Sequence, residues 1–500
     1  MTHVHFIGIG GSGISAIARF LLESGTVVTG SDRALSPLAA DLQKAGATVY
    51  LGHAAGNVTV ADWVVRSSAI PDDNPEVVAA LGLGMPVYKR ADYLGRLMED
   101  KIGIAVAGTH GKTTTSAMLA WTLSRLGQDP SFIVGGVLNN IGVNAHAGEG
   151  SAFVVEADEY DRMFLGLKPR FGVVTNIEYD HPDCYPTPAD FRAAFVEFAA
   201  LIPVNGALVA CGEDMGAIEL MAEARRMGKR VIGYRIAENS LTASGEWALA
   251  QNVMTNPRGG FSFNAIIRLR SATNYVSNVQ LQVPGLHSVR NALVVLTLAA
   301  LLDLPLREAA KALGEFQGTG RRFEVKGEVN PSKRLRQSGQ APSTPTPKVP
   351  GREVPGQAGS GQVVTIIDDY AHHPTEIGAT LDAARARYPA RRIWAVWQPH
   401  TYSRTHALFD EFAASFEEAD EVIVSEIYAA REPKEDFSAE KVVKAMHHPS
   451  ARFIAELADI SNYLVSHLKP GDVLIVLSAG DADRVSAEVL TRLKEGESHE

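Results

Sequence analysis

The chain has 500 residues, 46% of them hydrophobic and 21% charged, as in ordinary globular proteins, and at roughly 150 residues per domain its length predicts about three domains. Its formal net charge of −10 argues against nucleic acid or an anionic membrane surface as a partner. The two cysteines, Cys184 and Cys211, are too few for a disulfide framework or a zinc site, which favours a reducing compartment.

The N-terminal segment predicts a core strand at residues 3–9 rather than a secretory signal, because it lacks a basic region followed by a long apolar one. The apolar stretch at 292–306 is too short for a membrane span, since Thr297 and Asp303 interrupt it. We therefore expect a cytoplasmic protein.

Short β-branched runs alternate with helical patterns from the first strand onward, which is typical of parallel sheets built from βαβ units. A helix follows the first strand and ends at Gly25. Ser36-Pro37 and Asn74-Pro75 each predict a capped helix start. Further strands are predicted at 26–30, 48–51 and 63–67.

The turn between the first strand and helix reads GIGGSGIS, so Gly8, Gly10 and Gly13 have the spacing of a dinucleotide-binding loop. Backbone N–H groups at a helix N-terminus favour a pyrophosphate, and glycines let it approach closely. Asp32 ends the second strand, near the distance at which an acid meets a ribose hydroxyl. A diphosphate ligand is favoured, but nothing in the loop identifies a nicotinamide.

A second unit begins near Lys101 with a strand at 102–108 and a helix at 112–126. The run GTHGKTTT lies between them and combines glycines, Lys112 and Thr113, which are the parts that cradle a nucleotide triphosphate and its magnesium ion. Its spacing departs from GxxxxGK[ST], because Val106 stands where the first glycine is usual. We predict ATP as the ligand, so the first loop holds something else.

Carboxylates end two of the next predicted strands, in FVVEADEYD and in GVVTNIEYDHPD. Glu156 closes the strand at 153–156, and His181 follows the strand at 172–176. Open α/β sheets bind ligands at this edge, and oxygen ligands suit Mg²⁺. A further strand is predicted at 207–211.

A third unit follows FQGTGRRFEVKGE and is interrupted at residues 330–362, which are rich in Pro, Gly, Ser and Gln. Such a segment buries too little apolar surface to fold, so we predict a flexible insertion between two strands, 323–329 and 363–368, that can pair as a hairpin. Strands and helices then alternate to the end, including predicted helices at 375–388 and 404–418.

Polar side chains gather where two strands of this third unit end, in IIDDYAHHPTEI and WQPHTYSRT: Tyr370, His372, His373, His400 and Arg404. Helix capping explains only part of this cluster. The pattern favours a pocket for a small zwitterion whose carboxylate Arg404 would hold.

These motifs, with SSAIPDDNPE, PGLHSVRNAL and FQGTGRRFE, occur in the order found in the Mur ligases, and the chain resembles in particular the members that join L-alanine to UDP-N-acetylmuramate. The resemblance covers everything except 330–362. It implies an α/β fold of three domains: a Rossmann-like domain at 1–100, a central P-loop-type ATPase domain with a parallel sheet at 101–320, and a Rossmann-like domain at 321–500.

The resemblance also implies an ATP-dependent ligase that activates the lactyl carboxylate of UDP-N-acetylmuramate as an acyl phosphate and couples it to L-alanine in peptidoglycan synthesis. Lys112 and Mg²⁺ would offset charge on the transferred phosphoryl group. The general base for the amine is open between His181 and His372. We expect a monomer or homodimer.

Site residues are implied in each domain. The UDP-sugar would meet Gly10, Gly11, Ser12, Gly13, Asp32 and Ser68. ATP would meet Gly108, Thr109, His110, Gly111, Lys112, Thr113 and Thr114, with His287 and Asn291 at the adenine, Arg321 or Arg322 at a phosphate and Asp369 at the ribose. Magnesium would meet Thr113, Glu156 and His181, and alanine would meet Tyr370, His372 and Arg404.

One departure affects the alanine pocket, because some family members have arginine where this chain has Thr401. Three alternatives stay open at this point. A recycling ligase would join a preformed tripeptide to the same sugar nucleotide, and QPHTYSRT argues against it. A nicotinamide-dependent dehydrogenase leaves GTHGKTTT unexplained, and a non-catalytic nucleotide sensor would not need the metal residues.

Overall fold

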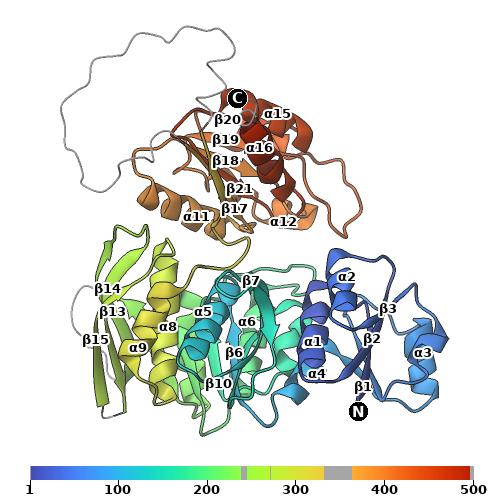
Figure 1. Ribbon diagram of the computed structural model, residues 1–500. Helices are drawn as coiled ribbons and strands as arrows, with labels where there is room; N and C mark the ends of the chain where they lie inside the picture. Colours follow the sequence, from blue (N-terminus) through green and yellow to red (C-terminus); the bar gives the residue numbers. More distant parts are fainter. Residues whose placement is uncertain (1, 238–244, 271, 331–362, 496–500) are drawn as a thin grey trace, which may run out of the picture. The chain divides into compact units, whose positions relative to one another are not determined.

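The structure is a computed structural model that describes residues 2–237, 245–270, 272–330 and 363–495. The chain forms three sheets (Figure 1). It divides into two compact units: Met1–Met254 with Ser262–Gln282 and His287–Thr319, and Thr255–Phe261 with Val283–Leu286 and Gly320–Glu500. Each unit is described by itself.

The first sheet, drawn in blue in Figure 1, confirms the βα alternation of the N-terminal sequence. Its five strands have the order β3-β2-β1-β4-β5 and all pair in parallel. Ser36 and Asn74 cap their helices as predicted, since each side chain accepts a backbone N–H of the first turn. The elements are β1 (His3–Ile7), α1 (Ser12–Glu23), β2 (Val27–Asp32), α2 (Pro37–Lys44), β3 (Thr48–Leu51), η1 (Ala55–Val58), β4 (Trp63–Arg66), α3 (Pro75–Gly82), β5 (Val87–Lys89) and α4 (Arg90–Leu97).

The central sheet has ten strands in the order β15-β14-β13-β12-β11-β10-β6-β9-β7-β8. The predicted parallel sheet is its core, where neighbouring strands from β7 to β13 pair in parallel. Antiparallel pairs, β7 with β8 and β14 with β15, extend this core at its two ends and make the sheet mixed. The strands are β6 (Ile102–Ala107), β7 (Ser131–Leu138), β8 (Val143–His146), β9 (Ala152–Glu156), β10 (Phe171–Val174), β11 (Ala207–Cys211), β12 (Val231–Ile236), β13 (Glu246–Thr255), β14 (Phe261–Leu269) and β15 (Ala272–Gln280).

Helices connect these strands. They are α5 (Lys112–Arg125), η2 (Tyr160–Gly166), α6 (Pro188–Ala200), α7 (Met215–Arg226), α8 (Leu286–Leu301) and α9 (Leu306–Glu315). The apolar stretch near 292–306 belongs mostly to α8, whose side chains are buried. Among the described residues, no helix is long and apolar enough to cross a bilayer.

The third sheet has the order β16-β17-β21-β18-β19-β20. β16 (Glu324–Val329) and β17 (Val364–Asp369) pair antiparallel, which confirms the pairing predicted for the two flanks of the insertion. Residues 331–362 of that insertion lie outside the described residues. The other strands are parallel: β18 (Ile393–Trp397), β19 (Glu421–Val424), β20 (Ala451–Phe453) and β21 (Val473–Leu477).

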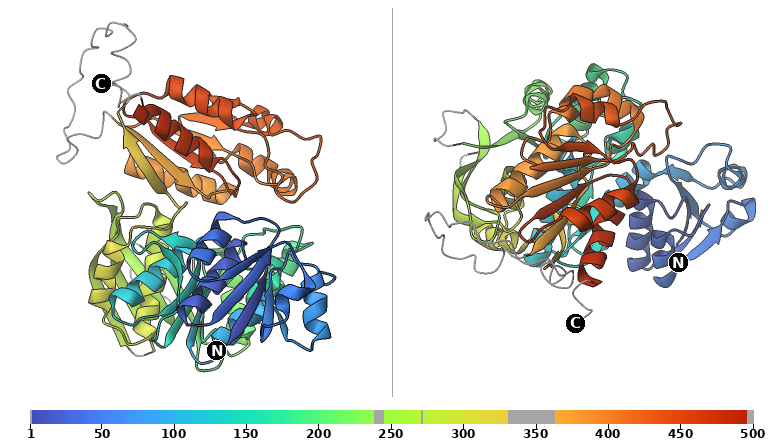
Figure 2. Two further views of the ribbon diagram at one scale, coloured as in Figure 1. Left: turned by 45° about the vertical axis from the view of Figure 1, so that its right-hand side comes forward. Right: turned by 90° about the horizontal axis from the view of Figure 1, so that it is seen from above.

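Helices cover both faces of the third sheet (Figure 2). Ile367 of β17 packs in one core with α11 (Pro374–Arg387), and its neighbour Ile366 packs in the other with α15 (Leu457–His467) and α16 (Asp483–Glu495). The single helix predicted at 404–418 is wrong, because the chain turns at Leu408 between α12 (Tyr402–Ala407) and α13 (Phe409–Ala413). A short helix, α14 (Glu440–Ala445), follows β19.

Candidate functional site

The opening glycine loop connects β1 to the N-terminus of α1. Gly8 has φ +82°, which favours glycine, and the N–H of Gly11 donates to the carbonyl of Gly8. No acidic side chain stands in the first turn of α1, so the positive end of this helix is open to an anion. Ser12 begins the helix, and its side chain is outside the description.

Asp32 braces the same loop from the end of β2. Its Oδ2 accepts the N–H of Gly10 at 2.8 Å and its Oδ1 accepts the N–H of Arg33 at 2.7 Å. A side chain at Gly10 would collide with Ser36 and Asp32, since a Cβ there would lie 2.5 Å from the Ser36 Oγ. Asp32 therefore lies beside the loop and shapes its backbone, and its contact with the sugar nucleotide stays a prediction.

The second glycine loop connects β6 to α5 and requires glycine at two positions. Gly108 has φ +131°, and a Cβ there would lie 2.0 Å from the Thr175 Oγ1. Gly111 has φ +81° and caps α5 in the left-handed conformation. The backbone can therefore turn sharply into the helix, as a phosphate loop must.

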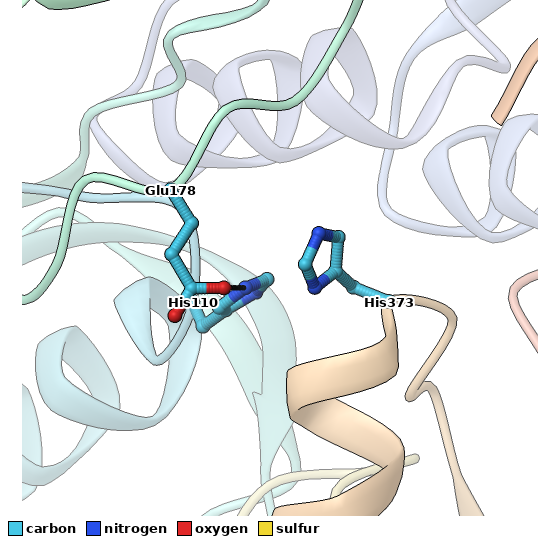
Figure 3. A group of neighbouring side chains, drawn as sticks. All are labelled: His110, Glu178 and His373. Atoms are coloured by element: carbon cyan, nitrogen blue, oxygen red, sulfur yellow. Dashed lines mark hydrogen bonds and ion pairs between the residues drawn. The ribbon is translucent and has the colours of Figure 1, made fainter. Parts of the chain in front are cut away.

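Hydrogen bonds fix this loop to the chain that follows β10. Thr109 Oγ1 donates to the carbonyl of Glu178 at 2.8 Å, and the His110 N–H donates to the Asn176 Oδ1 at 2.8 Å. The His110 ring also lies 3.3 Å from the Glu178 carboxylate (Figure 3). The loop is thus held in shape without a ligand, which lowers the ordering cost of binding one.

Lys112 points back over its own loop. Its ammonium donates to the carbonyls of Gly108 at 2.6 Å and Thr109 at 3.1 Å, and lies 2.8 Å from the Glu159 carboxylate. Burial disfavours the charged form, but Glu159 and Asp158 outweigh it, so the pKa of Lys112 is raised. Lys112 is therefore a fixed cation at the place where the phosphates are expected.

Thr113 and Glu156 meet beside it. The Thr113 Oγ1 donates to the Glu156 Oε1 at 3.0 Å, and the Glu156 Oε2 accepts the N–H of Gly135 at 2.7 Å. A hydroxyl and a carboxylate within hydrogen-bond distance are a donor set that suits Mg²⁺. The two residues come from α5 and the end of β9, as the sequence predicted.

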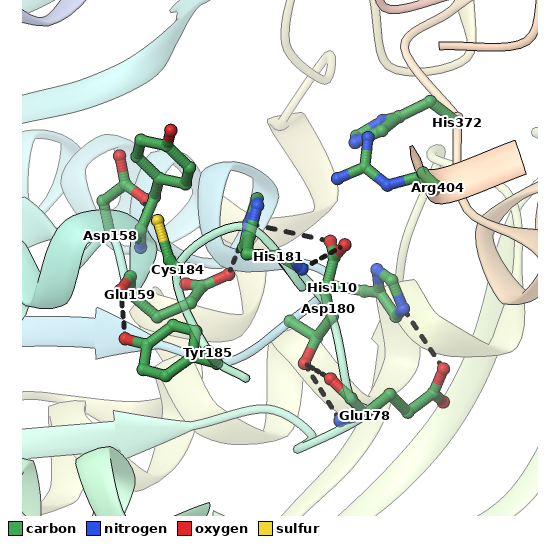
Figure 4. Close-up of polar contacts among 12 residues, drawn as sticks. His110, Asp158, Glu159, Glu178, Asp180, His181, Cys184, Tyr185, His372 and Arg404 are labelled. Carbon is green, nitrogen blue, oxygen red and sulfur yellow. Dashed lines mark hydrogen bonds and ion pairs between the residues drawn. The ribbon is translucent and has the colours of Figure 1, made fainter. Parts of the chain in front are cut away.

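His181 lies beside Glu159 and Asp180 (Figure 4). Its Nε2 is 3.7 Å from the Glu159 Oε1 and 3.6 Å from the Asp180 Oδ2, and its ring meets Tyr160 edge-on at 5.1 Å. His181 has φ +58°, an uncommon conformation for a residue with a side chain. The structure thus brings His181 to the counter-ion of Lys112.

Asn291 of α8 approaches the phosphate loop, and its contact with adenine stays a prediction. A Cβ on Gly111 would lie 3.6 Å from the Asn291 Oδ1. The buried Asn291 Nδ2 has no hydrogen-bond partner among the described residues, so it can donate to a ligand. His287 stands at the start of the same helix.

In the second unit, Asp369 ends β17 and is buried. Its two oxygens accept the N–H groups of Phe323 and Ala371, each at 2.7 Å. Burial raises its pKa to about 6, although Arg322 and these hydrogen bonds oppose that shift. Asp369 therefore braces the turn that follows β17, and Arg322 lies above the Tyr370 ring at 5.0 Å.

The predicted alanine residues gather where β17 and β18 end. The Tyr370 and His372 rings are 5.2 Å apart, and His372 and His400 are 5.9 Å apart. Arg404 is buried, and its Nη1 lies 3.3 Å from the His400 Nδ1. A guanidinium with aromatic neighbours at one sheet edge suits a small carboxylate.

Thr401 has φ +66° and ψ 148°, which is strained for a β-branched residue. Its N–H donates to the carbonyl of Tyr428 at 2.9 Å, and Glu432 accepts the N–H groups of Tyr402 and Ser403. These contacts hold the turn that places Arg404.

Sequence reasoning missed the parts played by Asp158 and Glu159. Asp158 pairs with Arg90, and Glu159 is only 1% exposed and pairs with Lys112. Both lie inside the acidic run VEADEYD, so the run was visible, but their partners are far away in the chain.

Comparisons with known families cover the same three parts of the chain. The description "Mur ligase family, catalytic domain" matches residues 3–102, "Mur ligase middle domain" matches 106–299, and "Mur ligase, glutamate ligase domain" matches 354–480.

Individual proteins match along almost the whole chain. A UDP-N-acetylmuramate–L-alanine ligase of Frankia casuarinae is 39% identical over 98% of this chain and 97% of its own length. The crystal structure of the UDP-N-acetylmuramate-alanine ligase of Thermotoga maritima has a TM-score of 0.73, 26% identity and coverage of 99% and 100%. A murein peptide ligase of Psychrobacter arcticus has a TM-score of 0.66, 26% identity and 99% coverage of both chains. The chain belongs to the Mur ligase family.

Proposed function

We propose that this ligase joins L-alanine to the lactyl carboxylate of UDP-N-acetylmuramate and converts ATP to ADP and phosphate in peptidoglycan synthesis. One observation carries the proposal: the first unit holds two glycine loops, of which only the second has a lysine and a metal-type pair at its helix. ATP takes the second loop, so the first is left for the sugar nucleotide. Relatives that match over the whole chain bear the name of this reaction.

Activation of the carboxylate is the first step. Hydroxide is a poor leaving group, so the lactyl carboxylate attacks the γ-phosphorus of ATP, ADP leaves, and an acyl phosphate forms. Lys112 holds negative charge on the transferred phosphoryl group once phosphate oxygens replace the carbonyls of Gly108 and Thr109 around its ammonium.

Magnesium would neutralise phosphate charge during this transfer. Thr113 and Glu156 are the proposed ligands, because their oxygens already lie 3.0 Å apart at the start of the helix that follows the phosphate loop. His181 stays in the proposed set because it lies beside Glu159, the partner of Lys112.

Coupling to the amine is the second step: the alanine nitrogen attacks the acyl carbon, phosphate leaves and the amine loses a proton. Arg404 is proposed to hold the alanine carboxylate, with Tyr370 beside it. The His372 Nδ1 faces the carbonyl of Tyr370 at 2.9 Å and the Glu376 carboxylate at 3.2 Å, so a neutral ring carries its proton there. Its Nε2 can then accept the amine proton, which favours His372 over His181 as general base.

Phosphate release tests the proposal when ATP, UDP-N-acetylmuramate and L-alanine are omitted one at a time. We expect release only with all three. The alternative ligase would release phosphate with a murein tripeptide in place of alanine, and the similar murein peptide ligase structure makes that arm necessary. Release without the sugar nucleotide would refute both. ATP and nucleotide sugars are cytoplasmic metabolites, so the proposed reaction takes place in the cytoplasm.

A further inference from the structure

A cavity of about 330 Å³ lies in the first unit between α4 and η2. The two elements approach closely, because a Cβ on Gly95 of α4 would lie 2.0 Å from the carbonyl oxygen of Gly166. The lining includes Ser68, the cations Lys89, Arg90 and Arg162, and the carboxylates Asp92 and Asp161. The excess of one cation favours an anionic occupant.

Arg90 is the first residue of α4 and reaches across to the opening glycine loop. A Cβ on Gly13 would lie 1.7 Å from the Arg90 Nη1, so the guanidinium packs directly on the first turn of α1. A cation at the positive end of a helix is unfavourable unless an anion accompanies it. The third glycine of GIGGSG thus leaves room for this guanidinium.

In the structure the accompanying anion is Asp158 of the central domain. Its Oδ2 lies 3.1 Å from the Arg90 Nη2, while the buried Arg90 Nε has no hydrogen-bond partner in the part of the chain that the structure describes. The carboxylate satisfies only part of the guanidinium, although a guanidinium presents five donors. A diphosphate has more oxygens and more charge than one carboxylate, so it can satisfy Arg90 more fully.

We propose that Arg90 binds the diphosphate of the UDP-sugar, and that Asp158 is the counter-ion which Arg90 exchanges for it. The inference rests on the proposed function and extends it, since it adds a binding residue outside the glycine loop. Ser68, expected along the UDP-sugar, lines the same cavity.

The exchange links the two nucleotide sites of the first unit. Asp158 stands next to Glu159, and its charge also acts on Lys112. When Arg90 binds the diphosphate, Asp158 loses its ion pair with Arg90. Lys112, on the ATP side, then remains as the cation near Asp158. Binding of the UDP-sugar therefore strengthens the electrostatic attraction between Asp158 and the Lys112 ammonium.

Calorimetric titration of UDP-N-acetylmuramate into purified enzyme tests the proposal, with ADP titration as the check that each variant is folded. Arg90→Gln should weaken UDP-N-acetylmuramate binding about 10- to 100-fold, as expected for a lost charge-assisted contact, and leave ADP binding within about threefold. Asp158→Asn should bind UDP-N-acetylmuramate at least as tightly as wild type, because the competing carboxylate is gone.

Arg96→Gln is the matched control, because Arg96 lies on the same helix, packs on Trp63 at 5.1 Å and is not among the residues that line the cavity. Equal losses in Arg90→Gln and Arg96→Gln, or a loss in Asp158→Asn as large as in Arg90→Gln, would overturn the exchange. Unchanged binding in Arg90→Gln overturns this inference alone. A wild-type enzyme that does not bind UDP-N-acetylmuramate overturns the proposed function with it.

Discussion

Replacing Lys112 by alanine tests the phosphate loop and its buried ion pair together. The Lys112 ammonium lies 2.8 Å from a Glu159 carboxylate that is only 1% exposed, so the variant leaves a buried charge without its partner. Such removal costs about 3–5 kcal/mol of stability. Loss of a cation that stabilises the transferred phosphoryl group costs a further factor of about 10² to 10³ in turnover.

A double variant separates the two effects. Glu159→Gln in the Lys112→Ala background removes the stranded charge, so we expect it to restore most of the lost stability and none of the activity. Thermal unfolding monitored by circular dichroism measures the first, and ATP-dependent phosphate release measures the second. Lys311→Ala is the control, because Lys311 is 70% exposed and pairs with Glu308 at the surface. It should change neither stability nor activity.

Two results would refute this account of Lys112. If Lys112→Ala is as thermostable as wild type, the pair with Glu159 does not hold the loop. If turnover falls less than about tenfold, Lys112 does not act on the phosphoryl group. Both variants should still bind UDP-N-acetylmuramate, because the opening loop does not include Lys112.

Arg404→Ala should raise the KM for alanine about 10-fold or more and leave the KM for ATP unchanged in steady-state kinetics, and an equal rise in both would remove Arg404 from the alanine pocket. Glu76 is fully buried, and although burial opposes ionisation, hydrogen bonds from His5, Ser31 and Asn57 lower its pKa from 4.5 to about 2. Its ionised form therefore contributes about 3 kcal/mol to the free energy of unfolding above pH 4.5, and this contribution is lost as the pH falls towards 2. Acid unfolding of Glu76→Gln should lack this loss of stability. Identical acid unfolding curves for the variant and the wild type would contradict the assignment. Asp369 makes stability depend on pH in the opposite direction, because its pKa is raised from 3.8 to about 6. Wild-type stability should fall as the pH rises from about 4 to 6. Asp369→Asn should reduce this slope in pH-dependent thermal melts without abolishing it, because burial also raises the pKa of Asp368 to about 6, and an unchanged slope would exclude Asp369 as a source.

Local pattern was enough to predict most elements around the site. The helix predicted at 112–126 is α5 to within a residue, because its glycine punctuation and periodicity are local. The antiparallel pair of β14 and β15 was not predicted, although these strands are neighbours in the chain, because strand propensity depends more on context than helix propensity does. The helix break at Leu408 carries no glycine or proline, and it lies beside the packing of Phe412 and Phe416 on Trp397.

In the candidate site, too, the residues of one local motif could be predicted and those defined by contacts far along the chain could not. The glycines, Lys112 and Thr113 could be predicted from their spacing, because they all lie in one loop. Glu159 could not be told apart from the other acids of VEADEYD, because its role comes from burial against a lysine 47 residues away. Arg90 carries no motif at all, and only its approach to Gly13 reveals it.

The cation that rests on the carbonyls of Gly108 and Thr109 has a consequence for inhibitor design. A neutral adenine mimic would leave that ammonium in place and compete only for the outer part of the nucleotide site. A compound that carries an acidic group to Lys112 would instead draw the side chain out of its resting contacts and gain a charge-assisted bond. Inhibitors of the ATP site therefore fall into two classes, those that leave Lys112 in its present contacts and those that displace it.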